Sequence, residues 1–205
     1  MEAKKGRREM KKFELTTEFI TNAFGKKLFR IKALVEFGDV KAGELGGYVE
    51  KEGNVSQAGN AWVYGNARVS GDARVSGNAW VYGNAWVSGN ARVYGDARVY
   101  GDARVYGNAE VSGNAEVYGD ARVCGNAWVY GNADYALVQG FGTEFRCTTF
   151  YRGKNKKIMV NCGCFHGDLE GFRKQVKETR NGKIAKEYLM IADLMEYHFT
   201  SEDSS

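Results

Sequence analysis

The sequence predicts a mainly β protein: a solenoid of short stacked strands between an N-terminal β cap and a C-terminal β-hairpin followed by two helices. The main observation is a six-residue phrase, Gly-(Asn/Asp)-Ala-x-Val-x, called a hexad below, which repeats between residues 59 and 134. Glycine occupies every sixth position from Gly59 to Gly131, and alanine follows two residues later each time. The flanking segments lack this period but contain strand-like and helix-like patterns. Because internal repeats determine architecture, the hexads predict the fold class.

The spacing within a hexad predicts a strand followed by a corner. Alanine and valine stand two residues apart, so on an extended chain they point to the same face, and the two x residues point to the other. Glycine with asparagine or aspartate tolerates the positive φ that a tight corner requires. Stacked hexads would therefore bury a continuous Ala/Val core that no single unit can form alone.

The stretch Val63-Tyr64-Gly65-Asn66-Ala67-Arg68 resembles the hexapeptide repeat of left-handed parallel β-helices, which include acyltransferases. The resemblance implies a left-handed, three-sided solenoid with three hexads per coil and about four to five coils. The lead-in from Phe37 to Val49 and the stretch from Val160 to Phe172 resemble segments of phage and prophage proteins. That likeness implies phage-type origin and carries no known chemistry.

The chain then divides into five segments. We expect a basic flexible tail over 1–12, an N-terminal β cap over 13–52, the β-helix over 53–138, a C-terminal ββαα module over 139–200 and a polar tail over 201–205. Within the β-helix, residues 53–58 form a degraded first hexad, with Val55 and Gln57 at the alanine and valine positions. In the module, Asp168 is a good helix N-cap, and Asn181-Gly182 separates the two helices.

Only the outward x residues vary freely from one hexad to the next. Residues 18 apart, one coil, should lie above one another. The first face would carry an unbroken column of Tyr64, Tyr82, Tyr100 and Tyr118, beside Trp62, Trp80, Arg98, Glu116 and Asp134. Such ladders stabilise a sheet, and a contiguous aromatic patch also meets partners. We therefore predict a binding surface formed by Trp62, Tyr64, Trp80, Tyr82, Arg98, Tyr100 and Tyr118.

Acyl transfer and metal binding are the alternatives to a binding surface. Acyltransferases of the hexapeptide type commonly use a histidine base, and the coils contain none; the two histidines are His166 and His198. The spacing Cys162-Gly163-Cys164-Phe165-His166 would place three ligand-type side chains on one strand face, with Cys147 nearby, yet it is not a strong zinc signature. A reduced core is the simpler interpretation. We predict no catalytic set, no metal site and no cofactor.

Charge and composition indicate which kinds of partner and which cellular location we expect. Outward arginines are accompanied by a similar number of Asp and Glu residues in the repeat, so nucleic acid is not the expected partner. The four cysteines do not suggest a secreted disulfide framework, and no signal peptide or membrane-spanning stretch is seen. We expect a cytoplasmic protein of a bacterial host cell that binds or scaffolds as a dimer or trimer. It could bind a host factor, for example in anti-defence; a hexapeptide acyltransferase-like enzyme is the alternative.

Overall fold

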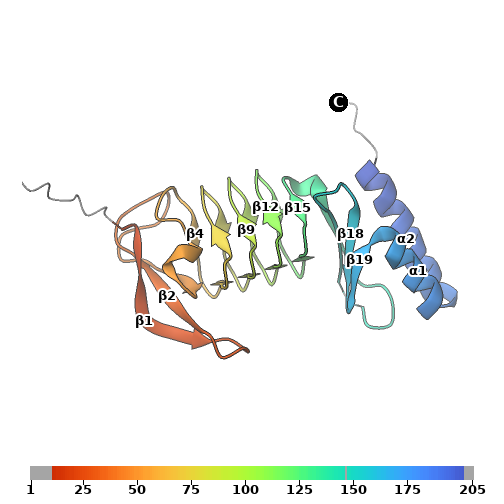
Figure 1. Cartoon of the computed structure of the whole chain (residues 1–205), viewed down its shortest axis with the longest axis horizontal. Coiled ribbons are helices and arrows are strands. Elements are labelled where there is room, and N and C mark those ends of the chain that lie inside the picture. The colour runs from red at the N-terminus through yellow and green to blue at the C-terminus, as the bar shows by residue number, and fades with distance from the viewer. Residues whose placement is uncertain (1–10, 146, 201–205) are drawn as a thin grey trace, which may run out of the picture.

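The computed structural model describes residues 11–145 and 147–200, which form a rod with a different structure at each end (Figure 1). The predicted fold class is confirmed: the chain is mainly β, with a solenoid of about five turns, an antiparallel sheet after it and two helices at the end. No helix among the described residues is long and apolar enough to cross a membrane.

The solenoid is built from strands of only two residues, each formed by an outward x residue and the following inward valine. These strands are β4 (Trp62–Val63), β5 (Arg68–Val69), β6 (Arg74–Val75), β7 (Trp80–Val81), β8 (Trp86–Val87), β9 (Arg92–Val93), β10 (Arg98–Val99), β11 (Arg104–Val105), β12 (Glu110–Val111), β13 (Glu116–Val117), β14 (Arg122–Val123) and β15 (Trp128–Val129). The chain turns at a corner after each strand and enters a different sheet, so each strand is short.

Strands one coil apart pair in parallel, which shows that the rod has three sides. Val81 pairs with Val63 on one side and with Val99 on the other, a step of 18 residues in each direction. The three sheets run β4-β7-β10-β13, β5-β8-β11-β14 and β6-β9-β12-β15. The predicted vertical stacking of residues 18 apart is therefore confirmed, while the left hand of the coil stays a prediction from the resemblance.

The inward side of the rod is a continuous Ala/Val core. The alanines from Ala61 to Ala127 and the valines from Val63 to Val129 are all fully buried. The prediction that these positions face inward is confirmed, since two residues apart on a strand share one side.

At most corners of the rod, glycine is required for two reasons. Gly83 has φ of +71°, a conformation that L side chains rarely adopt. A Cβ on Gly83 would also lie 3.1 Å from the backbone nitrogen of Gly101 in the next coil. The corners of adjacent coils are thus in close backbone contact, which explains why the hexad keeps glycine there.

The last hexad departs from the repeat. Residues Asn132–Asp134 form a 3₁₀ turn, η2, and Ala133 is exposed. The Asp134 carboxylate accepts hydrogen bonds from the backbone nitrogens of Tyr130 (2.9 Å) and Gly131 (3.1 Å) and pairs with Arg152 at 3.0 Å. The expected place of Asp134 in the outward column of the first face is therefore wrong, because the chain turns here into the C-terminal sheet.

The N-terminal end is closed by a hairpin that continues one of the solenoid sheets. Strands β1 (Phe13–Thr21) and β2 (Lys27–Ala33) are antiparallel, β2 pairs with β3 (Leu45–Val49), and β3 pairs in parallel with β5. Phe13, Ile31 and Val40 belong to the same buried cluster as the Ala/Val core. The first coil thus begins at β3, and the cap covers its open end, as such edges require.

Two expectations about this end are wrong. Val55 pairs in parallel with Val75 and is buried, so it stands at a valine position, while Gln57 is exposed and accepts hydrogen bonds from the backbone of residues 12 and 13. The short 3₁₀ turn η1 (Glu52–Asn54) shifts the register by burying Asn54, whose amide donates to the carbonyls of Gly71 and Ala73.

The predicted flexible tail includes two residues that are fixed in the structure. Lys12 is buried, and its ammonium group donates to the carbonyl oxygens of Ala61 (2.8 Å) and Gly59 (3.3 Å). Lys11 pairs with Glu52 at 2.8 Å. These carbonyls have no further coil to accept from, so the lysine satisfies them at the end of the rod. Residues 1–10 of the predicted tail and the predicted tail over 201–205 lie outside the described residues.

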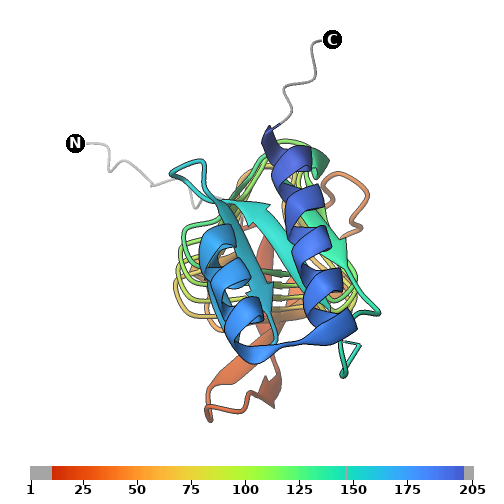
Figure 2. The same ribbon diagram turned by 90° about the vertical axis from the view of Figure 1, so that its right-hand side faces the viewer.

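The C-terminal module is a four-stranded antiparallel sheet with two helices on its outer face (Figure 2). Its elements are β16 (Tyr135–Val138), β17 (Thr148–Arg152), β18 (Ile158–Cys162), β19 (Phe165–Asp168), α1 (Leu169–Thr179) and α2 (Gly182–Thr200). The predicted hairpin and helices are confirmed. Asp168 caps α1, accepting from the Gly171 nitrogen at 2.9 Å. Strand β19 was not predicted.

Alternation along β17 shows how this sheet joins the two parts of the molecule. Tyr151 belongs to the buried cluster of the solenoid, whereas its neighbour Phe150 belongs to the cluster formed with the helices. One face of the sheet therefore closes the rod, and the other carries α1 and α2. The domain boundaries at 53 and 139 stay predictions.

Candidate functional site: an aromatic groove on the first face

The first face is the side of the rod formed by β4, β7, β10 and β13, and it brings most of the predicted site residues together. The register places Trp62 beside Trp80, Trp80 beside Arg98 and Arg98 beside Glu116. Strands β7 and β10 pair with a neighbouring strand on both sides, whereas β4 and β13 at the ends of this sheet pair on one side.

The tyrosines of the first face form a stacked column over three coils. The rings of Tyr82 and Tyr100 stack with centroids 4.8 Å apart, and those of Tyr100 and Tyr118 with centroids 5.3 Å apart. Tyr64 instead packs against Trp80, with centroids 5.3 Å apart and planes tilted by 46°. The column is therefore continuous from Tyr82 to Tyr118, and Tyr64 turns out of it at the N-terminal end.

Trp62 is placed differently from the prediction. It is fully buried, with Phe13 and Phe37 of the cap packed edge-on against its indole at centroid distances of 5.9 and 5.3 Å. The expectation that Trp62 contributes to an exposed surface is wrong, because the cap folds over the first coil. The only sequence signal for this burial was the position of Trp62 at the start of the repeat.

The structure contains a groove of about 660 Å³ along this face, beside the cap. Its floor and one end are aromatic and its other side is polar. The lining residues are Gly38, Asp39, Asn60, Tyr64, Asn78, Trp80, Tyr82, Asp96 and Arg98. Four of the predicted site residues, Tyr64, Trp80, Tyr82 and Arg98, therefore converge on one concavity, while Tyr100 and Tyr118 lie further along the column.

One wall of the groove is a ladder of corner side chains. The Asn60 amide nitrogen donates to the side-chain oxygen of Asn78 at 3.1 Å, and the Asn78 amide donates to the Asp96 carboxylate at 2.9 Å. Sequence reasoning assigned these residues to turns alone and missed them as site residues. Their spacing of 18 residues, the length of one coil, was the signal that could have found them.

The charge of the groove is mainly negative. Asp39 and Asp96 contribute carboxylates, and the one cationic lining residue, Arg98, is already within 3.4 Å of Glu116. Burial raises the pKa of Tyr64 and Tyr82 above the ordinary tyrosine value, so both hydroxyls stay protonated near neutral pH. The groove thus offers aromatic faces, hydroxyl donors and carboxylate acceptors, and its lining residues include no histidine, cysteine or lysine that could act as base or nucleophile.

A second hollow lies between the last coil and the end of α2. Its volume is about 890 Å³, and Trp128, Tyr130, Arg152, Leu194 and Tyr197 are among its lining residues. Beside it, α2 exposes an apolar stripe, the α2 stripe, made of Met190 (61 % exposed), Leu194 (58 %) and Tyr197 (71 %). These residues are spaced by four and three positions and so share one helix face.

The cysteine and histidine segment does not form the predicted single strand face. Gly163 has φ of +60° and turns the chain between β18 and β19, so His166 lies opposite Asn161. The His166 Nε2 lies 3.0 Å from the Tyr151 hydroxyl, which lies 3.3 Å from Cys124 Sγ. Across the described part of the chain, no three His, Cys, Asp or Glu side chains are close enough to hold a metal ion.

Comparison with known proteins supports a repeat fold and nothing finer. The repeat family described as YdcK Beta solenoid repeat matches residues 61–74, 73–89, 85–101, 91–107 and 97–113. The starts of these matches differ by six or twelve residues, in step with the hexads. No curated protein matches the chain. The protein is therefore a β-solenoid repeat protein whose matched segment covers the aromatic side of the groove and not the cap loop with Asp39.

Proposed function

We propose that this protein is a non-enzymatic binding or scaffold solenoid that takes a basic segment of a partner protein into the first-face groove. One observation carries the proposal: Tyr64, Trp80 and Tyr82 line the same concavity as Asp39 and Asp96. Aromatic faces attract cations, and arginine together with aromatic residues is enriched at the energetic centres of interfaces. A partner arginine or lysine there would meet both rings and carboxylates.

The rigidity of the groove supports binding rather than a moving catalytic site. The ring ladder and the Asn60-Asn78-Asp96 ladder both run across neighbouring coils, so the side chains are ordered before a partner arrives. Preorganisation lowers the entropy that binding would otherwise cost. The lack of a histidine among the lining residues leaves hexapeptide-type acyl transfer, the alternative function, without its usual base.

Self-association is the second part of the proposal, and we place it on the α2 stripe rather than on the tyrosine column. Tyr82 and Tyr100 are only partly exposed and stack on each other, whereas the α2 stripe is more than half exposed. Lys183 and Lys186 precede the stripe, and Asp193 and Glu196, which also pair with Arg173 at 2.7 Å, accompany its second half. In an antiparallel two-fold pair centred near Met190, the lysines of one helix face the acids of the other, which favours a dimer.

The resemblance to phage-borne proteins suggests the setting. A phage or prophage protein acting in the cytoplasm of its bacterial host would meet host factors, and interference with a defence system is one use of a binding solenoid. The resemblance is the support for this setting, and it points to host proteins as partners that experiments in the native host can identify.

Groove binding is tested with matched double variants. Trp80→Ser with Tyr82→Ser removes the aromatic floor, and Arg92→Ser with Tyr94→Ser changes the equivalent outward positions on another side of the same rod. We expect a partner captured from the native host to be lost with the first variant and retained with the second. Asp39→Asn with Asp96→Asn should weaken capture too. Equal capture by all variants would remove the groove from the proposal.

Two further measurements separate the alternatives. Leu194→Asp should reduce the mass in light scattering to that of a monomer, while Phe24→Ser, at an exposed hairpin tip, should not. An unchanged mass for Leu194→Asp would reject the α2 dimer. Titration with acetyl-CoA should leave the melting temperature unchanged; saturable stabilisation would favour the acyltransferase instead.

A further inference from the structure

Two arginines on adjacent coils lie side by side with no acidic partner. Arg104 in β11 and Arg122 in β14 are register neighbours on the second face, the side formed by β5, β8, β11 and β14. Neighbouring strands lie about 4.8 Å apart, so the two guanidinium groups start from closely spaced backbones. Among the described residues, no carboxylate lies within ion-pair distance of either one.

Each outward column of the other two faces contains a glutamate, although Arg74 and Arg92 on the third face, the side formed by β6, β9, β12 and β15, are register neighbours too. On the first face, Arg98 neighbours Glu116, and on the third face Arg92 neighbours Glu110. The corresponding column of the second face carries Arg68, Trp86, Arg104 and Arg122. The charge balance of the whole repeat thus conceals a segregation by face, because the acids of the outward strand positions lie on the other two sides.

A like-charge pair directly opposite on a sheet is destabilising. The Arg104–Arg122 pair therefore costs free energy that the rod itself does not recover through an ion pair. Such an arrangement is expected where a ligand of opposite charge completes it, since two adjacent guanidinium groups present several N–H donors to one anion.

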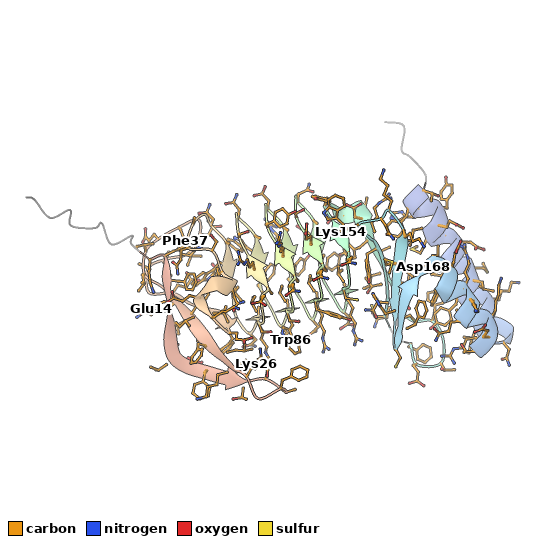
Figure 3. The ribbon with its side chains drawn as sticks, in the orientation of Figure 1. Glu14, Lys26, Phe37, Trp86, Lys154 and Asp168 are labelled. Atoms are coloured by element: carbon orange, nitrogen blue, oxygen red, sulfur yellow. The ribbon has the colours of Figure 1, made fainter. Side chains whose placement is uncertain are left out.

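The surroundings of the pair form a small cleft with fixed walls. Arg104, Arg122, Trp86, Ser88 and Tyr106 line about 150 Å³ on this face. The Trp86 indole N–H donates to the Ser70 hydroxyl at 3.3 Å, and the Tyr106 hydroxyl accepts from the Asn161 amide at 3.1 Å. Figure 3 shows Trp86 on the same side of the rod as Lys26 of the β1–β2 hairpin, whose ammonium group pairs with Glu50 at 2.9 Å.

The two flanks of the pair are not equivalent. On the flank toward Gln139 and Phe145, Arg104 and Arg122 line another cleft together with Asp102 and Asp120. Those carboxylates would repel an anion. The flank toward Tyr106 is lined by cationic, aromatic and hydroxyl groups only, so an anion is favoured there.

We infer that Arg104 and Arg122 form a binding site for a phosphate-type oxyanion, seated between the two guanidinium groups and the Ser88 hydroxyl. The cleft volume suits one phosphate group rather than a whole drug-sized ligand. The remainder of a phosphorylated small molecule would extend over the Trp86 ring, where a flat group can stack. This inference is independent of the first-face groove.

The test compares two arginine pairs in the same rod. Arg104→Gln with Arg122→Gln removes the proposed site, and Arg74→Gln with Arg92→Gln removes the register neighbours on the third face, where Glu110 is adjacent. Melting temperature and calorimetric binding are measured with inorganic phosphate and, separately, with AMP, at an ionic strength kept constant with chloride. Both probes carry the same phosphate chemistry, and AMP adds a ring.

We expect saturable stabilisation of the wild type and of the third-face variant, and its loss in Arg104→Gln with Arg122→Gln. Without phosphate, the latter variant should melt no lower than wild type, because it removes a repulsion. Tighter binding of AMP than of phosphate, reduced by Trp86→Ala, would support stacking on the ring. Equal stabilisation of both double variants, or no saturable binding by the wild type at millimolar phosphate and AMP, would overturn the inference.

Discussion

Tyr82 and Tyr100 lie one coil apart with ring centroids separated by 4.8 Å and planes inclined by only 3°. This relationship follows from the exact 18-residue register of the strands that carry them. Tyrosines at the same outward position of successive coils start at strand spacing, which is close to the preferred distance of offset stacks, although Tyr64 packs against Trp80 instead. The outward ladder is thus a product of the same geometry that builds the core.

The first prediction concerns this ladder. Tyr100 stacks on both neighbours, and its hydroxyl donates to Glu116 at 3.2 Å. Tyr100→Leu should lower the free energy of unfolding by about 1–3 kcal/mol, because two aromatic pairs are lost. Tyr100→Phe keeps both pairs and should cost about 1 kcal/mol or less. Urea denaturation of the two variants measures the difference; equal losses would mean that stacking adds nothing.

The second prediction concerns the core. Val93 is fully buried in the middle of the rod, and Val93→Asp would place a charge where no partner can reach it. We expect loss of the native circular dichroism spectrum. Val93→Ala, the size control, should fold and lose about 2 kcal/mol for the deleted methyl groups. A native spectrum for the aspartate variant would contradict the inward position of Val93.

The third prediction separates the two reasons for corner glycines. Gly107 and Gly119 both have positive φ, but a Cβ on Gly107 would lie 2.9 Å from the Gly125 nitrogen, whereas on Gly119 the nearest atom is 3.9 Å away. Gly119→Ala should cost about 1 kcal/mol through backbone conformation alone. Gly107→Ala should cost a further ~1–3 kcal/mol because adjacent coils must separate. Equal melting temperatures would show that the contact relaxes freely.

The fourth prediction concerns pH. Burial lowers the pKa of Lys12 to about 8, below its value of about 10.4 in the unfolded chain. Between these values the unfolded state binds the proton more tightly, so the free energy of unfolding should rise with pH, by ~2 kcal/mol between pH 7 and about pH 9.5. Chemical denaturation over this range should show the rise in wild type and in Lys11→Met, and not in Lys12→Met.

The rise in the free energy of unfolding with pH should end when the tyrosines begin to ionise. Burial raises the pKa of Tyr64, Tyr82 and Tyr100, so the folded state holds these protons more tightly. Their contribution is intact below the unfolded tyrosine pKa of about 10 and is lost above it, and stability should therefore fall again. A rise that continues unchanged above pH 10 in wild type would contradict this assignment.

The sequence by itself determined the rod. The positions of Ala67, Val69 and Gly71 in one hexad state which side chains face inward and where the chain turns, and repetition every six residues leaves no other consistent arrangement. The helix beginning after Asp168 was predictable for a similar reason, since capping and the apolar stripe are local. Three sides per coil came from the resemblance and were confirmed by the pairing of Val81 with Val63 and Val99.

The tertiary structure decided what the ends do and which outward residues are accessible. Only the folded cap shows that Trp62 is buried, that Lys12 satisfies carbonyls of the first coil, and that Asp39 reaches the groove. Likewise, only the coil register places Arg104 and Arg122 on a different face from the outward glutamates of the repeat. A periodic pattern specifies relations between neighbours along the chain, whereas accessibility and charge environment depend on segments that are distant in sequence and meet only after folding.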